Sequence, residues 1–304
     1  MPLKKDTAAI FGAGCFAEKV IDQLKQRFEI SFAVDNNVEK QGTYFQGYPV
    51  LSPEALLEET NVTIIICIRF PAEVIGQLEK MNVPNPIYAI GPQYTTDIKL
   101  IKIQDFDYAM DDLFDYYYSN DHEYHVPLSQ WKQPKLYFVA ADIISKQPRK
   151  KMLPILEIGC GSGQFANLLF ERGYINYTGI DISSKAIKLA RNMNPNHMDK
   201  FLAGNIFDNI VMLDDYDLII SFEVLEHLKN DLELVKSIPC GKRFLFSVPD
   251  FWSFNHLRVF KSTDDIKDRY GALLKITSVQ EIVYDKAVYF LVDSVRRNSH
   301  ESFC

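Results

Sequence analysis

The chain has 304 residues, and its 47% of hydrophobic residues can bury two ordinary cores. A formal net charge of −7 gives no general attraction to nucleic acid, whose non-specific binding depends on clustered Lys and Arg, so we expect no nucleic-acid partner. Five scattered cysteines without a C-x-x-C pair, no signal peptide and no apolar run of about 20 residues indicate a cytoplasmic protein that is not inserted in a membrane. A small-molecule substrate is the expected partner.

The first part of the chain alternates short β-branched runs with amphipathic stretches. We expect strands at 8–11, 30–34, 63–68 and 87–90, and helices at 16–28 and 72–81. A strand–helix–strand order predicts a parallel sheet with right-handed crossovers. Residues 1–97 are therefore predicted to form a Rossmann-like domain.

Residues 98–151 are rich in aromatic and polar side chains, and we expect them to form a helical connector or cap. Its aromatic residues either pack the two domains together or roof an active site. An exposed aromatic connector would also suit a homo-oligomer. The aromatic residues concerned are Phe106, Tyr108, Phe114, Tyr116, Tyr117, Tyr118, Tyr124, Trp131, Tyr137 and Phe138.

A second strand–helix alternation fills residues 152–304. Strands are expected at 155–158, 177–180, 200–202, 218–222 and 244–248, with helices at 164–172, 185–192 and 232–237. Residues 273–279 and 287–295 look like two strands joined by a short turn, which predicts an antiparallel pair at the end of a mostly parallel sheet. The predicted fold class is α/β, with two doubly wound Rossmann-like domains.

The most specific motif runs from Leu156 to Gly163 and reads L-E-I-G-C-G-S-G. It follows a predicted strand and opens a predicted helix. Glycines at alternate positions let the backbone approach a ligand closely, and the helix presents its N-terminal amides. Asp181 ends the next predicted strand, where a carboxylate can accept hydrogen bonds from both hydroxyl groups of a ribose.

E-x-G-x-G-x-G followed by G-x-D resembles the class I S-adenosylmethionine-dependent methyltransferases. The resemblance implies a seven-stranded sheet with a reversed last strand and S-adenosylmethionine as cofactor. It places Gly159, Gly161 and Gly163 around the methionine part of the cofactor, and Asp181 on the ribose. Asn205 stands where the family usually has an acidic residue that contacts the adenine. The other expected cofactor-site residues are Glu157, Ile182, Ile206 and Glu223.

An E-x-x-E-H run follows the strand at 218–222 and supplies the candidate catalytic groups. If a helix begins there, Glu223, Glu226 and His227 share one face. The loop at 248–258 leaves the next strand toward the same edge of the sheet and carries His256 and Arg258. Glu157 and this run also argue against an NAD-type fold, which a lone G-x-G-x-x-G would allow.

Ubiquinone-type O-methyltransferases and small-RNA 3′-terminal 2′-O-methyltransferases carry a similar E-x-x-E-H. That resemblance implies Mg²⁺ or another divalent cation bound by Glu223, Glu226, His227 and His256. The alternative uses no metal: the two glutamates cap a helix and contact the cofactor, and His227 or His256 acts as the general base. Arg258 either pairs with an acidic group of the substrate or lies in solvent.

The N-terminal domain has a nucleotide-binding pattern of its own. Gly12 and Gly14 belong to a G-x-G-x-x-A run, and Asp35 closes the next strand, as in a dinucleotide fingerprint. The surrounding residues resemble the nucleotide-sugar-binding domain of bacterial sugar acetyltransferases, and Arg69 could serve a pyrophosphate. A purely structural Rossmann-like domain is the alternative.

Together these features predict an O-methyltransferase that acts on a sugar, a nucleotide-sugar or a glycan in polysaccharide biosynthesis. The alternatives are a methyltransferase for RNA termini or a phenolic small molecule, and a non-catalytic ligand-binding scaffold. Acidity counts against RNA, and the lack of an amphipathic membrane-binding stretch counts against a lipid quinone. An NAD-dependent oxidoreductase ranks last.

Overall fold

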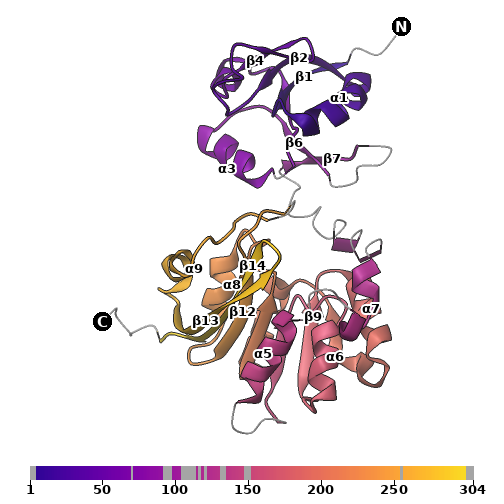
Figure 1. Ribbon diagram of the computed structural model, residues 1–304, viewed down its shortest axis with the longest axis vertical. Coiled ribbons are helices and arrows are strands. Elements are labelled where there is room, and N and C mark those ends of the chain that lie inside the picture. Colours follow the sequence, from indigo (N-terminus) through magenta and orange to yellow (C-terminus); the bar gives the residue numbers. More distant parts are fainter. Residues whose placement is uncertain are drawn as a thin grey trace. The chain divides into compact units, whose positions relative to one another are not determined.

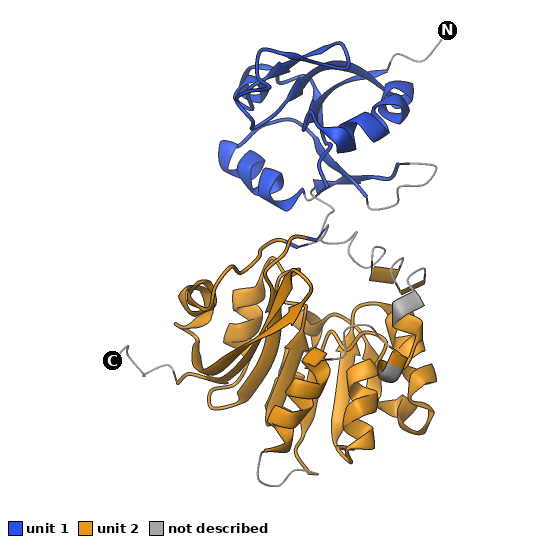
Figure 2. Cartoon of the chain, in the orientation of Figure 1, with its two compact units in different colours: residues 1–110, 253–256 blue, residues 111–252, 257–304 orange. Residues whose placement is uncertain are grey.

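The computed structural model describes residues 5–69, 71–91, 98–103, 114–115, 118–119, 122–130, 135–146, 152–253 and 256–298. The chain divides into two compact units, residues 1–110 with 253–256 and residues 111–252 with 257–304 (Figure 2). Among the described residues each unit contains one seven-stranded sheet. The predicted α/β class with two Rossmann-like domains is confirmed.

Unit 1 is built on a sheet of strand order β3-β4-β2-β1-β5-β6-β7 (Figure 1). The neighbours from β4 to β6 are parallel, and β3 and β7 pair antiparallel at the two edges. Its elements are β1 (Asp6–Phe11), α1 (Cys15–Arg27), β2 (Phe28–Val34), β3 (Tyr44–Phe45), β4 (Tyr48–Leu51), α2 (Ala55–Glu58), β5 (Thr63–Ile66), α3 (Ala72–Met81), β6 (Ile87–Ile90) and β7 (Leu100–Lys102).

In the central strands β1 and β5 of unit 1, residues 8–11 and 64–66 are apolar and buried, as expected for a sheet covered on both faces. Ile10 in β1 and Ile65 in β5 are fully buried, and α1 and α3 bury Leu24 and Leu78. The predicted helices and strands are all present. The elements missed were short ones at or near the edges, β3, β4, α2 and β7, which carry too few residues for a periodic pattern.

Unit 2 has the strand order β10-β9-β8-β11-β12-β14-β13. Strand β14 is antiparallel to both of its neighbours, so the predicted reversed last strand is confirmed. The elements are η2 (His122–His125), η3 (Leu128–Gln130), α5 (Lys135–Ser145), β8 (Ile155–Ile158), α6 (Gln164–Glu171), β9 (Tyr177–Asp181), α7 (Ser184–Met193), η4 (Pro195–Lys200), β10 (Phe201–Ala203), η5 (Ile206–Asp215), β11 (Leu218–Phe222), α8 (Asp231–Ser237), β12 (Arg243–Pro249), α9 (Thr263–Tyr270), β13 (Leu274–Tyr284) and β14 (Ala287–Arg296).

Two hydrophobic clusters cover the opposite faces of this sheet. One contains Leu136 of α5 and Phe165 of α6, and the other contains Leu234 of α8 and Ile266 of α9. Successive side chains of β14 alternate between the two clusters, as a pleated strand requires. With both faces covered, the polar chemistry of unit 2 is left to the carboxyl edge of its strands.

The predicted connector does not form one separate body in the structure. Leu100–Lys102 is the edge strand β7 of the first sheet, whereas α5 packs in unit 2. Its aromatic residues Phe106, Tyr108, Tyr116, Tyr117 and Trp131 lie outside the described residues. Among the described helices, none combines the length and the apolar character needed to cross a membrane.

Candidate functional site

The glycine-rich loop lies between β8 and α6, and its three alternate glycines all have a positive φ. The values are +74° for Gly159, +53° for Gly161 and +76° for Gly163. A Cβ on Gly159 would lie 2.3 Å from Cγ2 of Val224, and one on Gly163 would lie 2.9 Å from Cβ of Ala190. Both the backbone conformation and the close packing therefore require glycine here.

Asp181 is held at the end of β9 by the loop it faces. The N–H of Gly161 donates to its Oδ2 at 2.9 Å, and the N–H of Ser183 donates to its Oδ1 at 2.9 Å. Burial raises the pKa of this carboxyl to about 6, against the two N–H bonds, and the charge of Asp115 adds to the rise. Each oxygen keeps a second lone pair, so the two together can accept a pair of ribose hydroxyls.

Asn205 and Ile206 lie beside Asp181 at the same edge. Ala203 of β10 is in register with Asp181, and the N–H of Gly204 donates to the Asp181 carbonyl oxygen at 2.9 Å. Asn205 caps η5 by accepting the N–H of Phe207 at 3.0 Å, and its side chain is exposed. The structure thus brings together the ribose and adenine positions expected from the sequence, with Ile182 directly after Asp181.

Glu157 is buried in β8 and contacts a tyrosine. The hydroxyl of Tyr177 donates to its Oε2 at 2.5 Å, and burial raises the pKa of Glu157 to about 8. A Cβ on Gly179 would lie 2.7 Å from that hydroxyl oxygen and 2.8 Å from the Cys160 sulfur. Glu157 therefore belongs to a tight cluster at the base of the glycine-rich loop.

Glu223 follows β11 with a φ of +55°, unusual for a residue with a side chain. Ser247 of β12 holds it there: the serine hydroxyl donates to Oε1 at 2.7 Å and accepts the Glu223 N–H at 3.1 Å. Burial raises the pKa of Glu223 to about 7. The expected helix starting at this position is wrong, because 225–227 form a turn and α8 begins only at Asp231.

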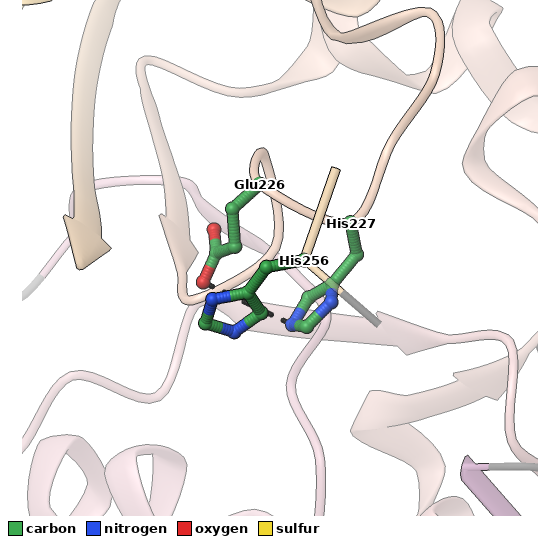
Figure 3. A group of neighbouring side chains, drawn as sticks. All are labelled: Glu226, His227 and His256. Carbon is green, nitrogen blue, oxygen red and sulfur yellow. Dashed lines mark ion pairs between the residues drawn. The ribbon is translucent and has the colours of Figure 1, made fainter. Parts of the chain in front are cut away.

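The turn brings Glu226 and His227 together with His256 from the loop after β12 (Figure 3). One ligand atom of each lies within 4.8 Å of the other two. Nε2 of His227 is 3.8 Å from Oε1 of Glu226. The N–H of Leu257 donates to the Glu226 carbonyl oxygen at 2.7 Å, so His256 is held beside Glu226 by its own chain neighbour.

Glu226 is fully buried, and as a carboxylate neither of its oxygens has a hydrogen-bond donor among the described residues. Burial raises the pKa of Glu226, the nearby Glu223 raises it further, and Arg258 opposes the rise. Its hydrogen bond to the Glu223 carboxyl exists only when the two groups share a proton. The pair can therefore take up a proton or a cation near neutral pH.

Arg258 supports the turn that carries Glu226. Its Nη1 donates to the carbonyl oxygens of Leu225 and Leu228, the second at 2.7 Å, and its Nη2 lies 3.4 Å from Asp231. Asp231 also accepts two bonds from Arg269 and one from Tyr270, each at 2.7 Å. These contacts give Arg258 a positioning role that the sequence did not indicate.

Unit 1 repeats the loop-and-aspartate arrangement. The N–H of Ala13 donates to Oδ2 of Asp35 at 2.8 Å, and the N–H of Asn37 donates to Oδ1 at 2.9 Å. Lys40 adds an ion pair at 3.0 Å, and its ammonium group lies 3.8 Å from the Cβ position of Gly14. Burial alone would raise the pKa of Asp35, but these bonds outweigh it and lower the pKa.

The remaining predicted residues of this N-terminal site lie at the same edge. Gly12 has a φ of +104°, and a Cβ there would lie 2.4 Å from Cγ2 of Ile68. Arg69 follows β5, the neighbour of β1, and is exposed.

Sequence reasoning missed Ser183 and Ser247, and it named Tyr118 only as one of ten connector aromatic residues. Ser183 caps α7 by accepting the N–H of Ala186 at 3.0 Å, and a serine before a predicted helix is a recognisable cap signal. Ser247 had no such signal, and nothing in the sequence distinguished Tyr118 from the other aromatic residues, because their partners Glu223 and Gly161 are distant in the sequence.

Two family models match the chain. Residues 130–256 match the family described as a methyltransferase domain, and residues 4–86 match the family described as C2185-like, N-terminal. No curated protein sequence matches.

Solved structures with a similar fold include magnesium protoporphyrin IX methyltransferase from Synechocystis PCC 6803 with bound S-adenosylmethionine. It has 16% identity and a TM-score of 0.49, covering 63% of this chain and 97% of that chain. An S-adenosylmethionine-dependent methyltransferase from Mesorhizobium loti has 19% identity and a TM-score of 0.40, covering 56% and 100%. The methyltransferase domain of a bacterial Hen1 protein has 17% identity and a TM-score of 0.39, covering 52% and 96%. At such identities these proteins indicate no substrate.

Proposed function

We propose that this chain, which carries a class I S-adenosylmethionine-dependent methyltransferase domain, is an O-methyltransferase acting on a sugar, a nucleotide-sugar or a glycan in polysaccharide biosynthesis. The observation that carries the cofactor part is the buried carboxylate of Asp181, held by two backbone N–H groups beside a loop of three glycines with positive φ. The protein has already oriented this carboxylate, so it accepts hydrogen bonds from two ribose hydroxyl groups at a lower entropic cost than a carboxylate free in water would.

The residues present fit the cofactor. Asp181 would hold the ribose, Asn205 and Ile206 the adenine, and the backbone of Gly159 and Gly161 the methionine part. When bound, S-adenosylmethionine supplies a methyl group on a positively charged sulfur. The chain's own task is then to place the acceptor hydroxyl in line with that methyl group and to remove its proton.

We assign proton removal to His256 or His227. Both imidazoles lie beside Glu226, within the group of atoms that are 4.8 Å or less apart. A neutral imidazole accepts a proton near neutral pH, and the carboxyl pair of Glu223 and Glu226 can stabilise the imidazolium ion that forms. With S-adenosylmethionine bound, the imidazole would accept the hydroxyl proton as the acceptor oxygen takes the methyl group, and the cofactor would leave as S-adenosylhomocysteine.

A divalent cation is the second version of this site. The two oxygens of Glu226 lack donors among the described residues although the side chain is fully buried, and two imidazole groups face it. Glu226, His227 and His256 would hold the ion, with Glu223 behind them. A bound cation would lower the pKa of a coordinated hydroxyl group, as Mg²⁺ or a similar ion does elsewhere.

The acceptor class is supported by the N-terminal unit, whose sequence resembles nucleotide-sugar-binding domains and whose loop, Gly12, Gly14 and Asp35 form a nucleotide-type arrangement. A phenolic acceptor or an RNA terminus is the alternative, and the net charge of −7 disfavours RNA.

Transfer of a labelled methyl group from S-adenosylmethionine to a panel of nucleotide-sugars, oligosaccharides, phenols and short RNAs tests this function. We expect label in a sugar-containing acceptor, and none with Asp181→Ala. Asp22→Ala, at a side chain that is 90% exposed on α1, is the matched control and should retain activity. Cofactor binding without transfer to any acceptor would favour the scaffold alternative.

A second experiment separates the histidine and cation versions. Glu226→Gln should lower the turnover number at least about 100-fold while changing cofactor affinity less than about threefold, because it removes the carboxylate that would stabilise the imidazolium ion or hold the cation and leaves the cofactor-binding loop unchanged. Glu58→Gln, at an exposed glutamate, is the control. Activity abolished by a chelator and restored by Mg²⁺ or another divalent ion would select the cation version, and activity unchanged by a chelator would exclude it.

A further inference from the structure

We infer that Tyr118 is a further cofactor-binding residue, whose hydroxyl group donates a hydrogen bond to bound S-adenosylmethionine. The inference deepens the proposed function, since it concerns the same cofactor site. Tyr118 is one of the connector aromatic residues that the sequence analysis expected either to pack the domains together or to roof an active site.

The hydroxyl end of Tyr118 points at the glycine-rich loop. Its oxygen lies 2.8 Å from the Cβ position of Gly161, closer than the ring atoms Cζ at 3.6 Å and Cε1 at 3.7 Å. The phenol is also near Asp181: burial is the main cause of its raised pKa, and the Asp181 charge is the next. Tyr118 thus stands between the two groups to which we assign the methionine and ribose parts of the cofactor.

Two neighbours fix the position of Tyr118. The Tyr124 ring lies 4.6 Å from the Tyr118 ring, centroid to centroid, and a ring nitrogen of His125 is 2.7 Å from the Tyr118 carbonyl oxygen. Both contacts hold the backbone and the ring, and neither uses the hydroxyl group. The side chain is therefore oriented in advance, which lowers the entropy lost when a ligand binds.

The hydroxyl group has no hydrogen-bond partner among the described residues. Other buried tyrosines of unit 2 are different: Tyr177 donates to Glu157 at 2.5 Å, and Tyr270 donates to Asp231 at 2.7 Å. A hydroxyl group that makes no hydrogen bond within the described part of the protein can donate to an acceptor oxygen of the cofactor, on its ribose or its carboxylate.

Nearby residues of the same stretch connect this contact to the catalytic side. Asp115 accepts the Ser183 hydroxyl at 2.5 Å, next to Asp181, and the Phe114 ring lies edge-on to His227 with centroids 5.5 Å apart. The stretch that carries Tyr118 therefore also contacts Ser183, beside Asp181, and His227 of the candidate catalytic group.

Calorimetric titration with S-adenosylhomocysteine, which binds without turnover, tests the inference through Tyr118→Phe. This change keeps the ring and removes only the hydroxyl, so we expect the dissociation constant to rise about five- to tenfold. Tyr44→Phe makes the same change at a tyrosine that is 76% exposed in unit 1, and should leave affinity unchanged.

Equal affinity of wild type and Tyr118→Phe would overturn the inference while leaving the cofactor site intact. Tighter binding by Tyr118→Phe or by Tyr118→Ala would also overturn it, because the side chain would then obstruct the site. If the wild-type chain does not bind S-adenosylhomocysteine, the proposed function itself is contradicted. Thermal unfolding of each variant, recorded beside the titration, shows that a loss of affinity is not a loss of fold.

Discussion

The two Rossmann-like units share one local arrangement but differ in its charge. In each, an aspartate at the end of the second strand accepts one N–H from a glycine loop and one from the residue two positions after it. Asp35 also pairs with Lys40 at 3.0 Å, and its pKa is lowered. Asp181 has Asp115 nearby instead, and its pKa is raised to about 6.

This difference shows that two similar motifs can differ in their ability to bind a ligand. In unit 1 the carboxylate is neutralised within the protein, so a ligand would have to compete with Lys40. In unit 2 the carboxylate is buried and has no cationic partner among the residues that the structure describes, so a ligand that donates two hydroxyl groups relieves an unfavourable state. On this ground we place the cofactor in unit 2.

The largest expected effect is a loss of stability on replacing a loop glycine by alanine, and it should be larger in unit 1 than in unit 2. Gly12→Ala should destabilise unit 1 by more than about 3 kcal/mol, because φ is +104° and the new Cβ would meet Ile68 and the Cys67 carbonyl oxygen. A domain of this size should then lose more than about 10 °C in its unfolding temperature, measured by scanning calorimetry.

Gly161→Ala is the matched change in unit 2. Its φ of +53° is in the left-handed region, and its Cβ would meet only the end of the Tyr118 side chain. We expect about 1 kcal/mol of destabilisation and a marked loss of S-adenosylhomocysteine affinity. An equal decrease in unfolding temperature for Gly12→Ala and Gly161→Ala would contradict this difference between the two loops.

Glu157→Gln should stabilise unit 2 at alkaline pH. The folded pKa of Glu157, about 8, is above the ordinary value of 4.5, so the folded state holds a proton that the unfolded state has lost. The free energy of unfolding therefore falls as the pH rises from the ordinary pKa of 4.5 to the folded pKa of about 8. At the upper end of this pH range, the variant should be about 3 kcal/mol more stable than the wild-type chain. Unfolding curves over this pH range test it, with exposed Glu58→Gln as the control. If the variant is no more stable than the wild-type chain at high pH, ionisation of Glu157 does not destabilise the folded state.

Cofactor affinity should depend on the ionisation of Asp181. Ribose hydroxyls donate to the charged carboxylate, so binding weakens as the pH falls through about 6, by up to about tenfold per pH unit. Titrations with S-adenosylhomocysteine in buffers on both sides of this pH measure the slope. An affinity that is constant, or that increases at acid pH, would contradict the assignment.

Lys40→Met should have the smallest effect. The Lys40 side chain is 40% exposed, so its ion pair with Asp35 is expected to stabilise unit 1 by less than about 1 kcal/mol. The pKa of Asp35 should rise, because a neighbouring positive charge is removed, and nuclear magnetic resonance can follow it. An unchanged Asp35 pKa would mean that the backbone bonds alone set its state.

The sequence was sufficient for the main elements of both sheets, because buried parallel strands and the antiparallel end of the second sheet have clear periodic patterns. It was insufficient where a contact joins distant residues. The sequence motifs that contain Asp35 and Asp181 are similar. Only the structure shows that Lys40 pairs with Asp35 and that Tyr118 lies beside the loop that holds Asp181.

The catalytic run illustrates the same limit. Spacing suggested that Glu223, Glu226 and His227 share a helix face, whereas the structure gathers them through a turn and a glutamate with positive φ that Ser247 holds. Arg258 likewise looked like a substrate anchor, because sequence does not reveal that the carbonyl oxygens of Leu225 and Leu228 surround it.

The most direct test of the account compares the two aspartates in one experiment: titration of S-adenosylhomocysteine into the wild-type chain, Asp181→Asn and Asp35→Asn. Each substitution keeps the shape of the side chain and removes its charge. We predict one binding site per chain, an affinity about 100-fold weaker in Asp181→Asn, and a change below about twofold in Asp35→Asn. Undiminished binding by Asp181→Asn, or an equal loss in Asp35→Asn, would contradict the placement of the cofactor in unit 2.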